Sequence, residues 1–331
     1  MATLAESSVE AWLSGLESRD GAACISDARA FAHDESQYDA QYANDPANFR
    51  VGRGLVRVLR EHGVDCSGPA LEIGCGTGLL TLGLASELPH PLFLATDPSP
   101  AFLRITRRKL EQGGVAEPRV RFGVLMGEEL DRVPENEWSL VTLRSTLHHV
   151  LDWERFIEHA ARALRPGGAL VMQEPCMEGY LLMGVFARLF PIAAAAAGCP
   201  LSPEHARHAK VFEDTMRFYC RRDLDKAKAE DKHLFRVDEI MQVAQLHGLN
   251  VRFVPNRTLE SFDPVKEGDE SADTFSGFLR LYMRYCMCWP EALLKTFDQV
   301  MTPHVEWVES STARGTGPHM HGVFIATKRA E

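Results

Sequence analysis

The sequence contains no uninterrupted apolar run of the roughly 18 residues that a membrane-spanning helix needs. The nearest case, residues 181–198, is broken by Arg188 and Pro191. The N-terminal stretch also lacks a basic segment followed by an apolar one, so we expect no signal peptide. These absences predict a cytoplasmic protein that does not bind a membrane.

Cysteines at metal-binding spacing are missing as well. The chain has eight cysteines among 331 residues, and no two pairs of them have the spacing of a zinc site. His205 and His208 have helical spacing, but no third ligand of metal type is evident for them. We therefore expect no metal, and cysteines that are reduced and mostly buried.

Positive charge is scarce. The chain has 36 Lys and Arg against 46 Asp and Glu, which gives a net charge of −10. Proteins that bind nucleic acid phosphates or anionic membranes need clustered basic residues, so the balance argues against both partners. The hydrophobic content of 45% is that of an ordinary globular protein, and the length suggests roughly two domain-sized units.

Short apolar runs alternate with helical stretches from Pro69 to Pro175. This pattern is typical of buried parallel strands in an α/β sheet. Two further strand-like runs come later in the chain, after stretches that look helical. The expected strands are 70–74, 92–97, 120–125, 139–144, 169–174, 249–255 and 321–329.

These patterns divide the chain into six segments. A helical arm precedes the α/β core, and two helical insertions interrupt the end of the core. The expected segments are the arm (1–50), the core (51–175), the first insertion (176–235), a core helix and the sixth strand (236–256), the second insertion (257–318) and the last core strand (319–331).

The stretch ALEIGCGTGLLTLGLA, residues 70–85, has glycines at alternate positions between an apolar run and an amphipathic run. A strand that ends in such a turn and opens a helix presents free N–H groups to a ligand. A dinucleotide site would need its third glycine at position 79, which is Leu79, and no Lys follows as in a phosphate-binding loop. Asp97 ends the next strand, where an acid can accept both hydroxyls of a ribose.

LEIGCGTG (71–78), followed by the acid of LATDPSP (94–100), resembles the binding signature of class I S-adenosylmethionine (SAM)-dependent methyltransferases. Residues 145–175 resemble the later motifs of the small-molecule branch of that family, near the ubiquinone/menaquinone methyltransferase-like group. The resemblance implies an α/β fold with a Rossmann-like seven-stranded methyltransferase sheet and helical lid insertions. It also implies SAM as the cofactor.

The resemblance assigns cofactor contacts to the ends of the first three core strands. Glu72 would lie near the amino group of the methionine moiety, Asp97 would hold the ribose and Pro98 would lie beside the adenine. In the third-strand motif, either Met126 or Glu128 would contact the adenine. The remaining expected contacts are Gly74, Cys75, Gly76 and Gly78 in the turn and Arg144 at the end of the fourth strand.

The end of the fourth strand is where the cofactor methyl group and the substrate meet in this family. Arg144 ends that strand, and His148 and His149 follow it. An oxygen nucleophile needs its proton removed, so either histidine is a candidate base. We name Arg144, His148 and His149 as candidate catalytic residues.

All six tyrosines lie in the arm and the two insertions. These segments would close over the site and line a substrate pocket. The pocket candidates are Tyr38, Tyr42, Tyr180, Tyr219 and Tyr282.

We therefore predict methyl transfer from SAM to an oxygen, nitrogen or sulfur atom of a small molecule bound under a helical lid. Two alternatives stay open at this point. In the first alternative, the protein is a SAM-fold enzyme that does not transfer a methyl group. In the second, it binds SAM as a non-catalytic regulator. The sequence is also compatible with a homodimer.

Overall fold

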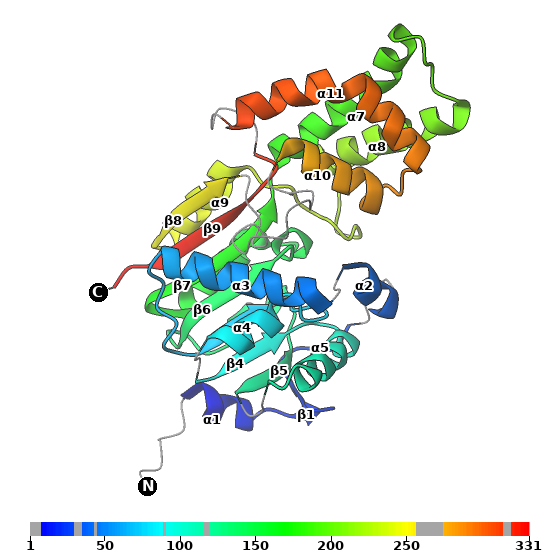
Figure 1. Cartoon of the computed structure of the whole chain (residues 1–331). Helices are drawn as coiled ribbons and strands as arrows, with labels where there is room; N and C mark the ends of the chain where they lie inside the picture. The colour runs from blue at the N-terminus through cyan, green and yellow to red at the C-terminus, as the bar shows by residue number, and fades with distance from the viewer. Residues whose placement is uncertain are drawn as a thin grey trace.

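The structure is a computed structural model that describes residues 8–29, 35–42, 45–88, 91–115, 119–255, 274–313 and 319–330. Within them the chain forms one mixed sheet in the order β1-β2-β5-β4-β3-β6-β7-β9-β8 (Figure 1). The strands are β1 (Ser18–Arg19), β2 (Ala22–Cys24), β3 (Ala70–Ile73), β4 (Phe93–Thr96), β5 (Val120–Val124), β6 (Trp138–Arg144), β7 (Leu164–Pro175), β8 (Leu249–Pro255) and β9 (His321–Lys328).

The seven strands expected from the sequence form a continuous part of this sheet. β2 to β7 pair in parallel, and β9 pairs antiparallel with both β7 and β8. The chain runs outward from β3 to β5 and then returns to β6 on the other side of β3. Such a reversal leaves a crevice at the carboxyl ends of the strands, where ligands bind in open α/β sheets.

The prediction of seven strands was too low, because the sheet has nine in the described residues. The two additional strands, β1 and β2, lie in the N-terminal segment that the sequence analysis took as helical. They form a hairpin whose turn is Asp20–Gly21, with φ angles of 51° and 75°. Asp-Gly is the favoured pair for a two-residue turn that needs positive φ at both positions. That signal was overlooked.

Helices cover both faces of the sheet. On one face, α3 (Asp45–Glu61), α4 (Thr81–Glu87) and α5 (Pro100–Gln112) bury apolar side chains against the strands. On the other face, α1 (Ser8–Ser14), α6 (Trp153–Ala163) and α9 (Val237–Leu246) do the same. The α/β fold is thus confirmed as three layers, helix, sheet and helix.

The two insertions form a helical unit that extends from one end of the sheet (Figure 1). Its helices are α7 (Met177–Ala196), α8 (Pro203–Cys220), α10 (Phe275–Leu281) with the π-helical turn η4 (Tyr282–Cys286), and α11 (Glu291–Ala313). They share a core of their own, which includes Phe190, Phe212, Phe275 and Phe297. Segments separated by a core strand in the sequence therefore pack into one body.

By length and composition, α7 is the one helix of the described chain that could cross a membrane, with a mean hydropathy of 1.6. A third of its most apolar stretch is buried. Met183, Phe186, Ala187 and Phe190 are all part of the core of the helical unit.

Candidate active site

The three glycines after β3 have positive φ angles, 67° at Gly74, 52° at Gly76 and 95° at Gly78. Their surroundings differ. A Cβ atom at Gly74 would lie 2.6 Å from the side chain of Thr146, and one at Gly78 would lie 2.6 Å from Leu82. A Cβ atom at Gly76 would meet no atom of the described residues within 4 Å. At Gly74 and Gly78 the neighbouring side chains leave no room for a Cβ atom, whereas at Gly76 the described residues leave that space empty.

Asp97 is joined directly to this turn. Its Oδ2 accepts a hydrogen bond of 2.9 Å from the backbone N–H of Gly76, and its Oδ1 accepts one of 2.8 Å from Ser99. The residue is only 6% exposed. Burial raises the pKa of Asp97 to about 6, although both backbone hydrogen bonds favour the ionised form.

Glu72 is a second buried carboxyl group in the same corner, with an exposure of 1%. The hydroxyl of Thr81 donates a hydrogen bond of 2.8 Å to its Oε2. Burial raises the pKa of Glu72 to about 8, and the charge of Asp97 acts in the same direction. In the part of the chain that the structure describes, no positive group contributes to that shift. The corner thus holds two buried carboxyl groups whose partners among the described residues are neutral hydrogen-bond donors.

Hydrogen bonds to neighbouring elements hold the rest of the turn in place. Cys75 is 3% exposed, and its N–H donates to the carbonyl of Thr96 at 2.8 Å. Thr106 donates to the carbonyl of Gly76 at 3.0 Å. These bonds fix the backbone on the protein side and leave the other side of Gly76 open.

Helix α2 (Glu35–Tyr42) packs beside the glycine turn. Lys109 is 7% exposed, and its Nζ donates to the carbonyl of Thr77 at 3.1 Å and to Asp39 of this helix. The ring of Tyr38 lies 5.2 Å from that of Phe102. Burial raises the pKa of Tyr38, and the charges of Arg144, Asp97 and Glu230 also act on it. Tyr38 is therefore close to the ends of β4 and β6. The side chain of Tyr42 lies outside the described part of the structure.

The residues expected at the adenine end contact the segment that follows the N-terminal hairpin. Pro98 accepts a hydrogen bond from the N–H of Arg29 at 2.9 Å, and Met126 donates its N–H to Ser26 at 3.0 Å. Met126 and Glu128 line the same cavity of about 180 Å³, together with Asp27, Arg29 and Glu129. Glu128 is exposed, and its Oε1 accepts the N–H of Leu151 at 3.1 Å.

The candidate catalytic residues follow β6 at the carboxyl edge of the sheet. Ser145 has a φ of 50°, a strained conformation for a residue with a side chain, and η2 (Leu147–His149) begins two residues later. Glu174 near the end of β7 organises this turn, because its Oε1 accepts the N–H groups of Thr146 and Leu147 at 2.9 and 2.8 Å.

Glu174 also fixes His148, since its Oε2 lies 2.6 Å from Nδ1 of the imidazole. The other nitrogen of His148, Nε2, lies 3.5 Å from Oδ1 of Asp231. Burial alone would lower the pKa of His148. The charges and hydrogen bonds of the two carboxylates outweigh burial and raise that pKa to about 10. His148 is therefore charged at neutral pH.

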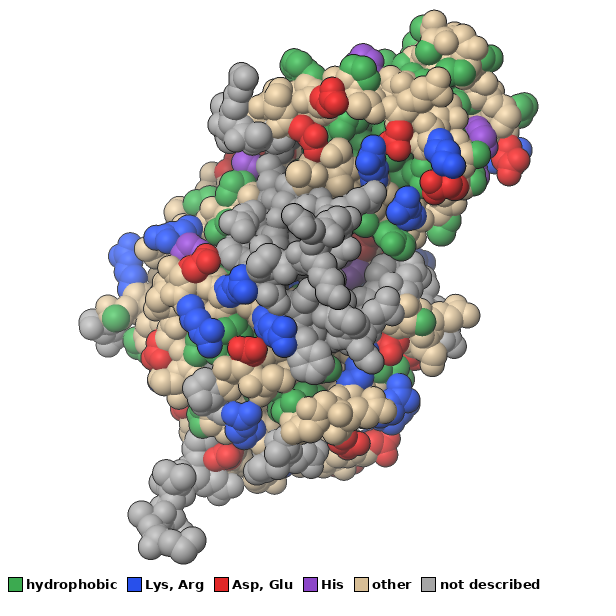
Figure 2. Space-filling model, in the orientation of Figure 1, with side chains coloured by type: hydrophobic (Ala, Val, Ile, Leu, Met, Phe, Trp, Pro, Cys, Tyr) green, Lys and Arg blue, Asp and Glu red, His purple; other side chains and the backbone are tan. Residues whose placement is uncertain are grey.

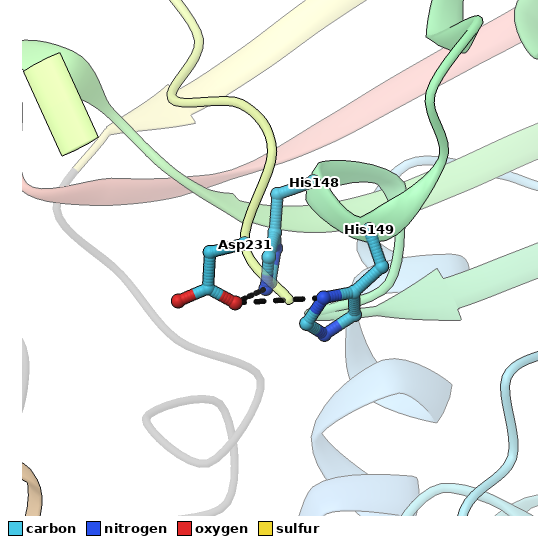
Figure 3. A group of neighbouring side chains, drawn as sticks. All are labelled: His148, His149 and Asp231. Atoms are coloured by element: carbon cyan, nitrogen blue, oxygen red, sulfur yellow. Dashed lines mark ion pairs between the residues drawn. The ribbon is translucent and has the colours of Figure 1, made fainter. Parts of the chain in front are cut away.

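His149 shares Asp231 with its neighbour (Figure 3). Its Nδ1 lies 3.4 Å from the same Oδ1 of Asp231 and 2.9 Å from the carbonyl oxygen of Glu230. Burial and the adjacent charge of His148 lower the pKa of His149. Burial would raise the pKa of Asp231, but the hydrogen bond and charge of His148 lower it to about 2. The cluster thus pairs one charged and one neutral imidazole with two carboxylates.

Three of the five tyrosines predicted for a substrate pocket come together in the helical unit. The ring of Tyr180 lies 5.6 Å from that of Tyr282 and 6.4 Å from that of Tyr219, in edge-to-face arrangements. A hydrogen bond with Asp231 contributes to the raised pKa of Tyr219. The tyrosine cluster therefore reaches the histidine cluster through Asp231.

Sequence reasoning missed Glu174, Lys109 and Asp231. A signal existed for Glu174, because it ends an expected strand, and neighbouring parallel strands bring their carboxyl ends to one edge. Lys109 stands in a helix among other basic residues, and Asp231 stands in the irregular segment KAKAEDKH. Neither has a local pattern that sets it apart from a solvated surface residue.

Comparisons with known proteins agree with this geometry. Residues 71–170 match the family described as a methyltransferase domain. The chain is 28% identical over 144 residues to a malonyl-[acyl-carrier protein] O-methyltransferase of Haemophilus ducreyi, covering 44% of this chain and 54% of that protein. It is 30% identical over 138 residues to a ubiquinone/menaquinone biosynthesis C-methyltransferase of Vibrio cholerae, covering 39% and 52%. The chain thus spans about half the length of the curated relatives it matches.

A solved methyltransferase structure from Galdieria sulphuraria superimposes with a TM-score of 0.50 at 13% sequence identity, covering 89% of this chain and 98% of that one. At this identity the likeness shows the fold alone. The sheet, the glycine turn joined to a buried acid, and the matches over residues 71–170 together identify that region as the domain of a class I SAM-dependent methyltransferase.

Proposed function

We propose that the protein transfers the methyl group of SAM to an oxygen, nitrogen or sulfur atom of a small molecule in the cytoplasm. One observation carries the proposal. Two buried carboxyl groups lie at the ends of β3 and β4, Glu72 and Asp97, of which Asp97 is bonded to Gly76, and among the described residues no cationic side chain contributes to the pKa of either. A ligand with a cationic group and vicinal hydroxyls would satisfy both acids.

SAM supplies an activated methyl group on a sulfonium leaving group. The protein must bind the cofactor, align the nucleophile with the methyl carbon and exclude water. In our proposal Asp97 accepts the ribose hydroxyls, Glu72 faces the ammonium group, and Gly76 allows the cofactor to lie against the backbone. Gly74, Cys75, Gly78 and Pro98 shape that side, and Met126 or Glu128 borders the adenine.

The transfer end of the proposed site lies after β6. Arg144, His148 and His149 are our candidates to face the nucleophile, and His149, whose pKa is lowered, is the imidazole that can accept its proton. The enclosure combines α2 with the helical unit. The α2 side of this arrangement is supported by Tyr38, whose ring lies 5.2 Å from that of Phe102, and by Asp39, which pairs with the Lys109 that bonds to Thr77 in the glycine turn.

The charge of the protein argues against a nucleic acid as the substrate and so supports a small molecule. The net charge is −10, and on the face drawn in Figure 2 acidic and basic side chains are interspersed. Two arginines that follow α8 are engaged at the surface, Arg221 with Asp223 and Arg222 with Glu239. Neither guanidinium is placed to clamp a substrate carboxylate inside the enclosure.

The first prediction tests methyl transfer itself. We expect the protein, given methyl-labelled SAM and a metabolite extract, to release S-adenosylhomocysteine and to label one small molecule. The measurement is mass spectrometry of the products.

Asp97→Asn should reduce SAM affinity by roughly tenfold or more, because a hydrogen bond to a charged group contributes about 1.5–3 kcal/mol. Asp65→Asn, an exposed acid, is the matched control. Binding without release of S-adenosylhomocysteine would favour a regulator, and another cofactor product would favour different chemistry.

The second prediction concerns Gly76. We expect Gly76→Ala to fold and to lose most of its affinity for SAM, because the added methyl group would occupy the open space along the backbone. Gly63→Ala and Gly114→Ala control for backbone strain, since both glycines have positive φ, 64° and 68°, and equally open surroundings. The melting temperatures of the three variants should be similar. Equal SAM affinity in all three, measured by titration calorimetry, would make the open side of Gly76 irrelevant.

The third prediction follows from the raised pKa of Glu72, about 8. An ammonium group beside Glu72 favours the ionised carboxylate, so binding should lower its pKa and release a proton at pH 6.5–8. Affinity for S-adenosylhomocysteine should then rise with pH through that window. Without ligand, the stability of the folded protein should instead fall as pH rises from 4.5 to about 8, because the raised pKa makes burial of ionised Glu72 progressively unfavourable.

Calorimetry in buffers of different ionisation enthalpy measures this proton. Glu72→Gln separates it from protons of the ligand, and the variant should release less. Proton uptake by the wild-type protein, or equal release by both proteins, would contradict a cation at Glu72.

The fourth prediction concerns the enclosure. Segments that close on a ligand come from the less stable parts of a fold. We expect hydrogen exchange in residues 35–42 and 221–236 to slow when S-adenosylhomocysteine binds, with little change in β3 to β7. The Gly76→Ala variant, under the same conditions, should show no slowing. Exchange that is already slow and unaffected by ligand would make these segments permanent structural additions.

A further inference from the structure

We propose that His148, His149 and Asp231 form a binding site for a divalent transition-metal ion at the end of β6. One donor atom from each side chain lies within 4.8 Å of the other two. Figure 3 shows the side chains facing one another, with Asp231 approaching from a separate segment. Sequence analysis predicted no metal, because the third ligand comes 82 residues after His149 in a stretch without a motif.

The distance between two of the proposed ligand atoms is that of atoms around a shared ion. Oδ1 of Asp231 lies 3.5 Å from Nε2 of His148. Two ligands of a four-coordinate ion with bonds of about 2.1 Å lie about 3.4 Å apart. By contrast, His148 and Glu174 form a direct contact of 2.6 Å in the same cluster.

The surrounding groups orient the donor atoms as second-shell partners do in metal sites. Nδ1 of His148 is held by Glu174, so Nε2 is the atom turned toward Asp231, and a bound ion would displace the proton that Nε2 carries in the free protein. Glu174 is itself held by two backbone N–H groups and is 1% exposed. The carbonyl oxygen of Glu230, 2.9 Å from Nδ1 of His149, can accept that N–H when Nε2 of His149 is the ligand. Metal-binding histidines usually have such a partner on their second nitrogen.

The donor set selects the class of ion. Two imidazoles and one carboxylate suit zinc, cobalt or ferrous iron, whereas magnesium prefers oxygen ligands alone. Three protein ligands leave at least one coordination position for water or another molecule. Because the cluster lies at the proposed transfer end, an ion there would favour substrates with an oxygen donor beside the methylated atom. This statement about substrate rests on the proposed function, whereas the metal site itself does not.

The experiment measures metal binding before activity. Protein with its affinity tag removed is freed of metal with a chelator and titrated with Zn²⁺ by calorimetry. We expect one ion per chain, a visible absorption spectrum of low-symmetry coordination with Co²⁺, and no comparable binding of Mg²⁺. Asp231→Asn and His149→Gln should each weaken Zn²⁺ binding by about 100-fold or more. Glu174→Gln should weaken it by roughly 10–100-fold, as other second-shell changes do.

Two controls remove similar groups elsewhere. The double variant His205→Ala, His208→Ala removes a histidine pair of α8, and Asp223→Asn removes an exposed acid before α9. Both should bind Zn²⁺ like the wild-type protein. Circular dichroism and melting temperatures establish that every variant is folded. Asp231 and His149 are both partly exposed, so these two variants should retain the fold.

The outcomes separate the metal site from the proposed function. No stoichiometric Zn²⁺ binding, wild-type affinity in both Asp231→Asn and His149→Gln, or loss of binding in the His205/His208 double variant would each overturn the site. None of these results affects SAM binding at the glycine turn. Conversely, an ion bound as expected in a protein that never releases S-adenosylhomocysteine would leave the metal site standing and remove the proposed methyl transfer.

Discussion

The hydrogen bond between the N–H of Gly76 and the carboxylate of Asp97 is the contact on which the rest of the site depends. It joins the turn after β3 to the end of β4, so two strands present their carboxyl ends as one surface. The contact requires a positive φ at Gly76 and a carboxylate with almost no access to water. Thr106, Thr77 and Lys109 then brace the turn from the side opposite the open space.

The second organising element is Glu174, which acts at the neighbouring pair of strand ends. It holds two backbone N–H groups and one imidazole, and thereby fixes the strained turn after β6. Asp231, in the segment before α9, lies beside the two histidines that follow β6. The N–H groups of Lys232 and His233 lie 2.8 and 3.2 Å from the carbonyl of His148, so this segment is fastened along the turn. Residues from the core and from the first insertion are thus joined at one edge of the sheet.

The parts of this arrangement that follow local rules could be predicted from the sequence. The glycine spacing, the acid after β4 and the period of the strands are each set by neighbours within a few residues, and the structure has them where expected. The Asp20–Gly21 hairpin also has a local signal and was overlooked. Asp231 and Lys109 could not be predicted, because their roles arise from contacts with His148 and Thr77 that only the tertiary fold creates.

The burial of uncompensated acids gives the site a common physical character. A carboxyl group with an exposure of 1%, such as Glu72, lowers stability unless it is protonated or paired. The fold tolerates this because hydrogen bonds from Thr81 to Glu72, and from Gly76 and Ser99 to Asp97, partly satisfy the two acids. A ligand that supplies positive charge and hydroxyl donors removes the remaining cost, and it therefore stabilises the folded state as it binds. Ligand affinity and the stability of the core should then both depend on how far the charges of Glu72 and Asp97 are compensated.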